Sequence, residues 1–360
     1  MKNGSILWND YNSNTPKLPS NWHLINGYLI GHGADLTGAD LTGTDLTGTD
    51  LTNANLTGVI SGSIVWNDYD SNAPKLPLDW KLINGYLIGP GSVPREGYGF
   101  RMRQMTNHYG SWERIGEGPN LSYTDLTGVD LTNANLTGAI LTDATLTDAT
   151  LTDATLTDAT LTGVKSSNVI INDSTLLPEN WTLINGHIVG PGADLTGADL
   201  TGANLNYTDL TGVDLTNANL TGANLYSAGL TGADLTGATL TGVKSSNVTI
   251  NDSTLLPENW TLINGHIVGP GADLTNANLT YTDLTGVDLT NANLTGANLY
   301  SADLTGADLT GADLTWAMLD YADLSGATLT GSYLTGADFN DVIISVDIIG
   351  SPEYYPVNWK

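Results

Sequence analysis

ADLTGADLTGTDLTGTDLTNANLTG, residues 34–58, repeats one five-residue phrase five times. With the central Leu called position i, the phrase has Ala or Thr at i−2, Asp or Asn at i−1, Thr at i+1 and Gly or Asn at i+2. A period of five matches neither the roughly 3.6 residues of a helical turn nor the roughly two residues of a flat strand. Gly and β-branched Thr also disfavour a helix. The pattern instead predicts an all-β chain that turns at each Gly or Asn and coils with Leu and Ala inside.

The phrase resembles the pentapeptide-repeat family, whose pattern A(D/N)LXX is matched by ADLTG, ANLTG and TDLTG throughout the chain. The resemblance implies a right-handed quadrilateral β-helix with four pentapeptides in each square coil. Leu at i would fill the interior, and the small residue at i−2 would pack beside it. We expect about 15 coils at the usual strand spacing of about 4.8 Å, with one insertion loop.

Four stretches interrupt the phrase and share the core WxLINGxxxG, at residues 18–31, 76–89, 177–190 and 256–269. They could separate domains, but the five-residue frame can be carried across them. Between Leu161 and Leu195 the inward positions continue as Ser166, Ile171, Leu176, Leu183 and Ile188, and residues 240–274 repeat this spacing. We therefore predict one continuous β-helix over residues 1–350 and a C-terminal cap or tail at residues 351–360. The widened corners would lie near residues 9–34, 66–92, 172–193 and 251–272.

Two long segments are near copies whose relative position shifts by one repeat. The copies begin at Val164 and Val243, but the matching residues Tyr207 and Tyr281 further along are closer together by one pentapeptide. The loss of one of four faces rotates everything downstream by a quarter turn. This rotation would split a binding site built from side chains on one flank. The repeats therefore favour a structural role, in which the length and stacking of the coils matter more than a composite surface.

The net charge is −27, from 38 acidic and 11 basic residues, which disfavours direct binding to nucleic acid or to an anionic membrane. The absence of Cys excludes disulfides and Cys-based sites. No apolar run approaches the roughly 20 residues of a membrane span, and the first residues, MKNGSILWNDYNSNTPK, lack the apolar core of a secretory signal. We expect a cytoplasmic, virion or non-classically exported protein, and the compartment stays open.

No set of residues predicts catalysis, a cofactor or a metal. His187 and His266 are expected outside, in a slot that Tyr28 and Tyr86 fill in the sister stretches, which does not suit a ligand. The Asp ladders suggest diffuse cation screening, because the calcium-binding nonapeptide signature is absent. One slot of the interrupting stretches always holds Trp, and we interpret these side chains as covers for the adjacent loop, with sugar binding as the alternative: Trp22, Trp80, Trp181 and Trp260.

The clearest departure from the repeat is residues 92–119, an insertion of about 27 residues that carries all four Arg of the chain. Arg and aromatic residues are enriched at interface hot spots. We therefore predict that the insertion binds a partner protein, although a basic loop could also fold back onto the acidic repeats. The predicted contact residues are Arg95, Tyr98, Phe100, Arg101, Arg103, His108, Tyr109, Trp112 and Arg114.

The tail keeps the five-residue frame before Pro352 and Pro356 end it. Both ends of a coil array need caps, since an open coil exposes unpaired backbone and core Leu. The resemblance also implies that end-to-end dimers through a C-terminal cap occur. We expect a cap or homodimer contact at Phe339, Ile344, Ile349, Tyr354, Tyr355 and Trp359.

Two function hypotheses follow. The first is a non-enzymatic structural or interaction scaffold: a rigid acidic rod of surface, fibre or virion type, whose insertion docks a protein partner. The second rests on the resemblance, because quinolone-resistance members of the family are acidic DNA mimics that bind DNA gyrase, a type II topoisomerase. An enzyme of β-helical fold has no support among the residues.

Overall fold

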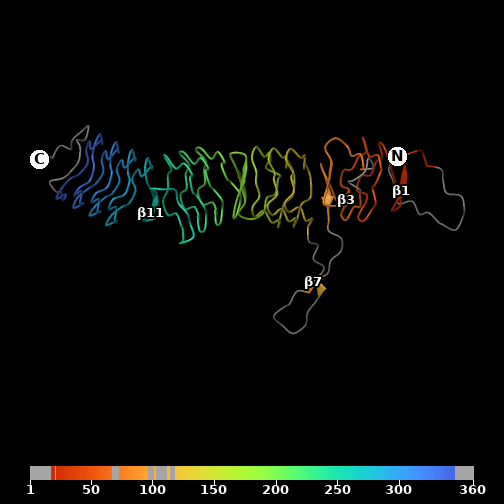
Figure 1. Cartoon of the computed structure of the whole chain (residues 1–360), viewed down its shortest axis with the longest axis horizontal. Helices are drawn as coiled ribbons and strands as arrows, with labels where there is room; N and C mark the ends of the chain where they lie inside the picture. Colours follow the sequence, from red (N-terminus) through yellow and green to blue (C-terminus); the bar gives the residue numbers. More distant parts are fainter. Residues whose placement is uncertain are drawn as a thin grey trace. The chain divides into compact units, whose positions relative to one another are not determined.

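The computed structural model describes residues 18–20, 22–66, 73–95 and 118–344, together with the backbone of residues 101–102 and 112–113. The chain divides into two compact units, Met1–Ile188 and Val189–Lys360, and each is described by itself. In both units the chain winds into stacked coils that carry short hairpins (Figure 1). No helix with the length and apolar character of a membrane span occurs among the residues that the structure describes.

Parallel β-bridges join residues at position i−1 to the equivalent residue four pentapeptides later. In the first unit Asp125 pairs with Thr145, and in the second unit Asp288 pairs with Asp308. Two backbone hydrogen bonds join neighbouring coils at each bridge. At the second of these bridges, the Leu289 N–H donates to the Asp308 carbonyl at 2.8 Å, and the Asp308 N–H donates to the Val287 carbonyl at 3.0 Å. Each regular coil therefore contains four repeats. The fold is a β-helix, as the resemblance to the pentapeptide-repeat family implies.

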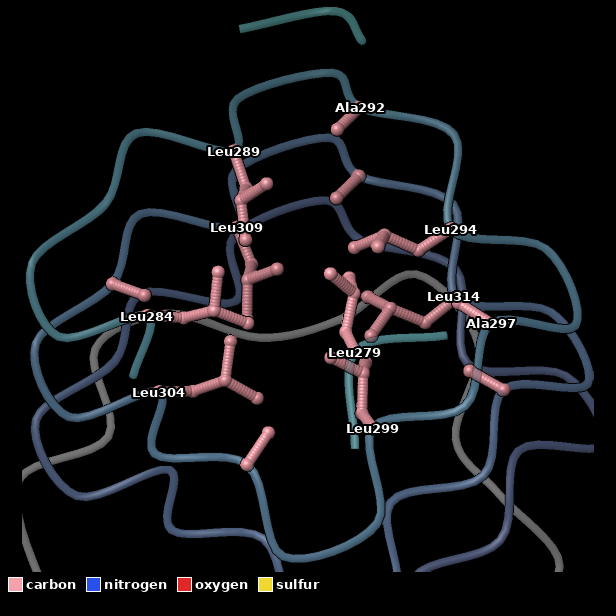
Figure 2. Close-up of a cluster of buried hydrophobic side chains, with 14 of the residues drawn as sticks. Leu279, Leu284, Leu289, Ala292, Leu294, Ala297, Leu299, Leu304, Leu309 and Leu314 are labelled. Atoms are coloured by element: carbon pink, nitrogen blue, oxygen red, sulfur yellow. The ribbon is translucent and has the colours of Figure 1, made fainter. Parts of the chain in front are cut away.

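The inside of the coils consists of Leu at position i and Ala at position i−2. Figure 2 shows this core in the second unit, where Leu289 lies above Leu309 and Leu294 lies above Leu314, with Ala292 at the top of the view and Ala297 at the right. These six side chains are buried, with at most 1% of their surface exposed. Burying a Leu side chain stabilises a fold by about 1.5–3 kcal/mol. The repeated Leu column therefore holds the stack together, as the sequence predicts.

The corners explain why position i+2 is Gly or Asn. After each inward Leu the chain makes a turn, such as the one closed by the Ala292 N–H and the Leu289 carbonyl at 3.0 Å. The residue at i+2 is left-handed: φ is 67° at Gly306 and 58° at Asn291. Only Gly adopts this region freely, and Asn and Asp tolerate it better than other residues. Tyr281 and Trp316 adopt it too, at 57° and 59°, and both therefore sit at corners.

The Asp at i−1 has a structural role in each repeat. One carboxylate oxygen of Asp283 accepts a hydrogen bond from the Thr285 N–H at 3.0 Å, and the same bond recurs from Asp35 to Asp323. Asn at i−1 accepts it equally well, as Asn293 does from Thr295. Asx side chains satisfy turn N–H groups in this way. The pattern A(D/N)LXX therefore specifies a turn as well as a core.

We expect the stack to lose stability in acid. Hydrogen bonds from Thr285 and Thr236 lower the pKa of Asp283 and Asp234 below the ordinary 3.8. A carboxyl group whose pKa is lowered by folding stabilises the fold above its unfolded pKa and loses that contribution as the pH falls through its folded pKa. The urea midpoint should be level near neutrality and fall below about pH 4. Asp283→Asn, which keeps the acceptor, should flatten this dependence, and an unchanged acid profile in a set of such variants would contradict the account.

The four interrupting stretches are antiparallel β-hairpins and not simple widened corners. They pair β1 (His23–Ile25) with β2 (Tyr28–Ile30), β4 (Lys81–Ile83) with β5 (Tyr86–Ile88), β9 (Thr182–Ile184) with β10 (His187–Val189) and β11 (Thr261–Ile263) with β12 (His266–Val268). Each turns at Asn-Gly, with φ of 50° at Asn264 and 75° at Gly265 in the last copy. This dipeptide suits a two-residue hairpin turn because both residues tolerate positive φ.

The predicted frame is therefore only partly right around these stretches: Ile188 and Ile267 are fully buried as expected, but other positions differ. Leu262 pairs with Ile267 across the hairpin, whereas the frame made them successive inward positions of one coil. Leu255 and Leu176 were expected inside, but they are 50% and 52% exposed. Leu255 bridges Asp234, one position beyond the regular spacing of four pentapeptides, and so occupies the outward position i−1. One extra residue at the preceding corner causes this shift.

Two further sheets complete the described structure. β3 (Ile60–Ser61) and β6 (Val93–Pro94) pair in parallel, so residues 93 and 94 belong to a coil of the first unit. β7 (Arg101–Met102) and β8 (Trp112–Glu113) pair antiparallel within the insertion. The backbone of the insertion therefore contains a hairpin of its own, labelled by β7 in Figure 1.

Candidate functional site

Three of the four hairpins are anchored by a Ser that replaces the inward Leu. In the second unit, Ser245 Oγ accepts a hydrogen bond from the Ile267 N–H at 2.8 Å, and its carbonyl oxygen lies 2.5 Å from His266 Nδ1. A carbonyl oxygen only accepts, so Nδ1 carries the proton. Ser245 and His266 are each 8% exposed. The hairpin is thus fixed to the coil by polar contacts inside the fold.

The first unit repeats this anchor. Ser166 Oγ accepts from the Ile188 N–H at 2.8 Å, with His187 on the Ser166 carbonyl, and Ser61 accepts from the Leu87 N–H at 3.0 Å. The prediction that His187 and His266 lie outside is wrong, because both rings are buried against a carbonyl group. Nδ1 of each ring is bonded to a Ser carbonyl oxygen, so each His helps to hold its hairpin and does not offer both ring nitrogens to a ligand.

Replacement of Ser245 by Ala tests the anchor. The change leaves the buried Ile267 N–H without its acceptor, and an unsatisfied buried donor costs about 1–3 kcal/mol. We expect Ser245→Ala to lower the free energy of unfolding by that amount, measured by urea denaturation followed by circular dichroism. Ser253→Ala, at an exposed position of the same coil, should change it by less than about 0.5 kcal/mol. Equal effects of the two substitutions would contradict the anchor.

The four Trp of the interrupting stretches are half-buried, and three of them are shown to lie on a Gly. A Cβ atom built on Gly269 would meet the Trp260 ring at 2.4 Å, and Trp80 and Trp22 lie in the same way on Gly89 and Gly31. The prediction that these rings cover the adjacent loop agrees with this packing. These four rings are half-buried, which leaves little of their surface open to a sugar.

Among the described residues no three His, Asp or Glu side chains come close enough to hold a metal ion together. Asn53 Nδ2 lies 3.2 Å from His32 Nε2. Two of the four Asp residues that occupy i+2 in residues 143–158 meet amides of the next coil: Asp148 accepts from Asn168 at 3.1 Å and Asp153 accepts from Asn172 at 2.9 Å. These amides ease the repulsion between the carboxylates of successive repeats.

The insertion is described only in part. The Arg95 side chain is exposed, and its backbone N–H donates to the Ser61 carbonyl at 2.7 Å, at the edge of the coil. In the hairpin, Arg101 pairs with Glu113 and Met102 with Trp112. The hairpin brings residues 101 and 112 of the predicted contact set onto neighbouring strands. The other predicted contact residues lie outside the described residues: Tyr98, Phe100, Arg103, His108, Tyr109 and Arg114.

The repeat itself decides the family. The family model for pentapeptide repeats matches residues 32–60, 124–163, 191–217, 209–242, 272–311 and 307–345, which together exceed half of the chain. The chain belongs to the pentapeptide-repeat family. Comparison with curated proteins gives no match.

Several solved structures of pentapeptide-repeat proteins are similar to this chain. HetL, which is involved in heterocyst differentiation regulation in the cyanobacterium Nostoc sp. strain PCC 7120, is 25% identical, covers 86% of this chain and 87% of its own, and has a TM-score of 0.16. QnrB1, a plasmid-mediated fluoroquinolone resistance protein, is 18% identical over 64% of this chain and 91% of its own, with a TM-score of 0.19. A protein of the Arabidopsis thaliana thylakoid lumen is 27% identical over 43% and 70%, with a TM-score of 0.12. At such TM-scores these likenesses carry no argument about function.

The predicted cap of this pentapeptide-repeat chain is only partly described. Phe339 is half-buried and packs against the Leu and Ala core of the second unit. Ile344 is 44% exposed and so does not continue the inward column. Ile349, Tyr354, Tyr355 and Trp359 lie outside the described residues, and a dimer contact there stays a prediction.

The sequence reasoning missed one group of outward residues in the second unit, all of which are exposed except the half-buried Tyr300. Large apolar side chains replace Thr, Asp or Gly at outward positions of three successive coils: Tyr281, Tyr300, Trp316, Met318 and Tyr321. A comparison of each repeat with the consensus at i−1, i+1 and i+2 would have found them. They make no part of the core and are considered below.

Proposed function

We propose that the protein is a non-enzymatic structural or interaction scaffold. In this proposal the coils form one continuous, right-handed, four-sided β-helix of about 15 coils over residues 1–350, capped by residues 351–360. Such a scaffold would be a rigid acidic rod of surface, fibre or virion type. The Arg-rich and aromatic insertion would dock a protein partner.

The observation that carries the proposal is the use of the outward polar side chains within the repeat. Asp at i−1 accepts from the backbone two residues later, and Thr at i+1 often donates its hydroxyl to the same oxygen, as Thr275 does to Asp273 at 2.6 Å. Side chains committed to local turns contribute little specific recognition or catalysis. Specific binding is then left to departures from the repeat, of which the insertion is the longest.

A pull-down from source lysate tests the docking role. The structure sets the limits of the deletion: Val93 and Pro94 pair with Ile60 and Ser61, so these residues must stay. A variant with residues 96–117 replaced by a short Gly-Ser linker is compared with the intact chain. We expect a partner that binds only the intact chain, with unchanged circular dichroism for both proteins. Capture of the same proteins by both would contradict docking through the insertion.

A second candidate function, an acidic DNA mimic that binds a type II topoisomerase such as DNA gyrase, is favoured by one observation. Carboxylates form outward columns at the spacing of the coils, as in the bridged series Asp283, Asp303 and Asp323. The local hydrogen bonds of these carboxylates explain their recurrence without a partner, so we rank this function second. A gyrase supercoiling assay left unchanged by micromolar protein would eliminate it.

A further inference from the structure

One side of the second unit carries an aromatic surface that the repeat does not require. We call it the aromatic face and define it by Tyr281, Tyr300, Trp316, Met318 and Tyr321. The bridges Asn278–Asn298, Asn298–Met318 and Met318–Asp338 place these residues on consecutive coils of the same side. The face lies within one unit and outside the insertion, so it is independent of the docking proposed above.

The three Tyr form a column at one corner. Tyr281 and Tyr300 have ring centroids 5.5 Å apart, and Tyr300 and Tyr321 have centroids 5.4 Å apart, both edge to face. Tyr281 is 73% exposed and Tyr321 is 50% exposed. Edge-to-face contact of this kind fixes the rings relative to one another. The column is therefore an ordered surface although it is open to solvent.

Trp316 supplies a flat platform across the same side. A Cβ atom built on Gly336 would lie 2.3 Å from Trp316 Cε3, so the indole lies directly on the backbone of the next coil. The residue is nevertheless 66% exposed. One face of the indole is thus supported by the coil while the rest is open to solvent. Trp260, by contrast, lies on Gly269 but is half-buried.

Polar groups without positive charge fill the space between the aromatic rings. Asn298 and Asp338 flank Met318 along the column at i−1, and Asp341 lies close enough to Tyr321 to raise the pKa of that phenol. The nearest rows of this side contain no Lys or Arg. Carboxylates disfavour nucleic acid, sulfated glycans and anionic membranes. An apolar helix would leave the interspersed amides and carboxylates unpaired, which costs free energy.

We propose that the aromatic face binds a neutral polysaccharide. A pyranose ring has an apolar face of C–H bonds that stacks on an aromatic ring, and hydroxyl groups that pair with amides and carboxylates. The aromatic face offers both kinds of partner in one place: the exposed indole of Trp316 and the phenols of Tyr281 and Tyr321 for stacking, and polar groups for hydrogen bonds. Asn298 Oδ1 and Asp338 Oδ1 already accept from the Tyr300 N–H and from Asn340, so Asn298 would contribute its amide N–H groups and Asp338 and Asp341 their remaining carboxylate lone pairs. An extended chain suits the face because the aromatic residues span three consecutive coils.

The chain contains its own control surface. Residues 207–228 are identical in sequence to residues 281–302, and Tyr207 and Tyr226 make the same edge-to-face pair at 5.3 Å. The coil that follows the first pair carries Lys244, Ser246 and Asn247, whereas the coil that follows the second carries Met318, Asp320 and Tyr321. The first pair therefore lacks the third Tyr, the Met and the Trp platform. It should not bind the polysaccharide by itself.

Native affinity electrophoresis of the full-length chain tests the proposal. Gels contain soluble mixed-linkage β-glucan, xylan, galactomannan, mannan or dextran, and centrifugation with cellulose or chitin covers insoluble chains. The test variant combines Trp316→Gly, Met318→Asp and Tyr321→Gly, each of which installs the consensus residue of the repeat and so preserves the fold. The control variant combines Tyr207→Gly and Tyr226→Thr. Circular dichroism should be the same for all three proteins.

We expect at least one neutral polysaccharide to retard the parent and the control variant equally and to bind the test variant about tenfold more weakly. Companion gels contain heparin or poly-lysine in place of the neutral chains. Three results would overturn the proposal: no binding to any neutral chain, equal binding by the test variant, or binding to heparin or poly-lysine alone. Binding to poly-lysine alone would assign the aromatic face to basic peptides through cation–π contacts. A failure here leaves the docking role of residues 96–117 untouched, because that role has its own readout.

Discussion

Leu309→Ala is expected to lower the free energy of unfolding by about 2–5 kcal/mol. Leu309 is fully buried in the core shown in Figure 2, beneath Leu289 and beside the other inward Leu side chains. The cost has two parts, the lost transfer of the side chain from water and the cavity that remains, and rigid backbone hydrogen bonds on both sides limit collapse of that cavity. Urea unfolding followed by circular dichroism measures it.

Thr330→Ala is the matched control for this prediction. Thr330 follows the inward Leu329, and its side chain is exposed. Removal of an exposed side chain changes stability by less than about 0.5 kcal/mol. If Leu309→Ala costs no more than Thr330→Ala, the inward Leu column does not hold the coils together and the core assignment fails.

Gly269→Val is expected to cost about 3 kcal/mol, because overpacking of a filled site costs about 1–3 kcal/mol and the clash here is with a large ring. The new Cβ would lie 2.4 Å from Trp260 Cδ2, so the indole must leave its place at the hairpin. The backbone of Gly269 is not left-handed, so the penalty comes from the Trp260 ring and not from φ. Thermal unfolding and the near-ultraviolet signal of Trp report the change.

Two comparisons isolate this cause. Gly229→Val, where the nearest atoms to an added Cβ lie 3.8 and 3.9 Å away, should change stability by less than about 0.5 kcal/mol. In a Trp260→Ala background the added cost of Gly269→Val should largely disappear, because the two residues are in contact and their effects are coupled. If the two substitutions change the free energy of unfolding additively, the packing of Trp260 on the hairpin does not depend on Gly269.

The coil could be predicted from the sequence because each position of the phrase has one physical role. Leu at i needs burial, Gly or Asn at i+2 needs positive φ, and Asp or Asn at i−1 accepts a turn hydrogen bond. The same requirements recur along the chain, so local and overall preferences agree. The number of repeats in a coil came from the family resemblance, and the bridges between residues four pentapeptides apart now give it directly.

The hairpins could not be placed by the same reasoning because their apolar residues keep a spacing of five. Leu262 and Ile267 satisfy the frame of the repeat, but the Asn264-Gly265 turn folds them back to face each other. The turn signal was in the sequence and outweighs the periodicity. Ser245 was a second signal, since a Ser in place of an inward Leu marks a backbone N–H that needs an acceptor.

For the candidate binding surfaces, the sequence shows which residues are unusual but not which of them lie together. The insertion stands out by its Arg and aromatic content, but composition does not tell which of its side chains come together. A comparison with the consensus finds each residue of the aromatic face but not that they form one surface, since Tyr281, Tyr300 and Trp316 belong to separate repeats and become neighbours only through the coil. Residues that depart from the repeat can be recognised as one surface only after each has been placed on its coil.

Disulfide formation measures the central claim most directly, because the chain has no Cys of its own. Asp308 and Thr328 are bridged neighbours on consecutive coils and both point outward, so a Cys pair at these positions meets the short Cα separation that a disulfide needs. Under mild oxidation the account predicts rapid and complete cross-linking of Asp308→Cys with Thr328→Cys. The pair Asp308→Cys with Asp323→Cys lies one pentapeptide short of a full coil, on different faces, and should stay reduced. Faster cross-linking of this second pair than of the first would contradict a coil of four pentapeptides and the scaffold built from it.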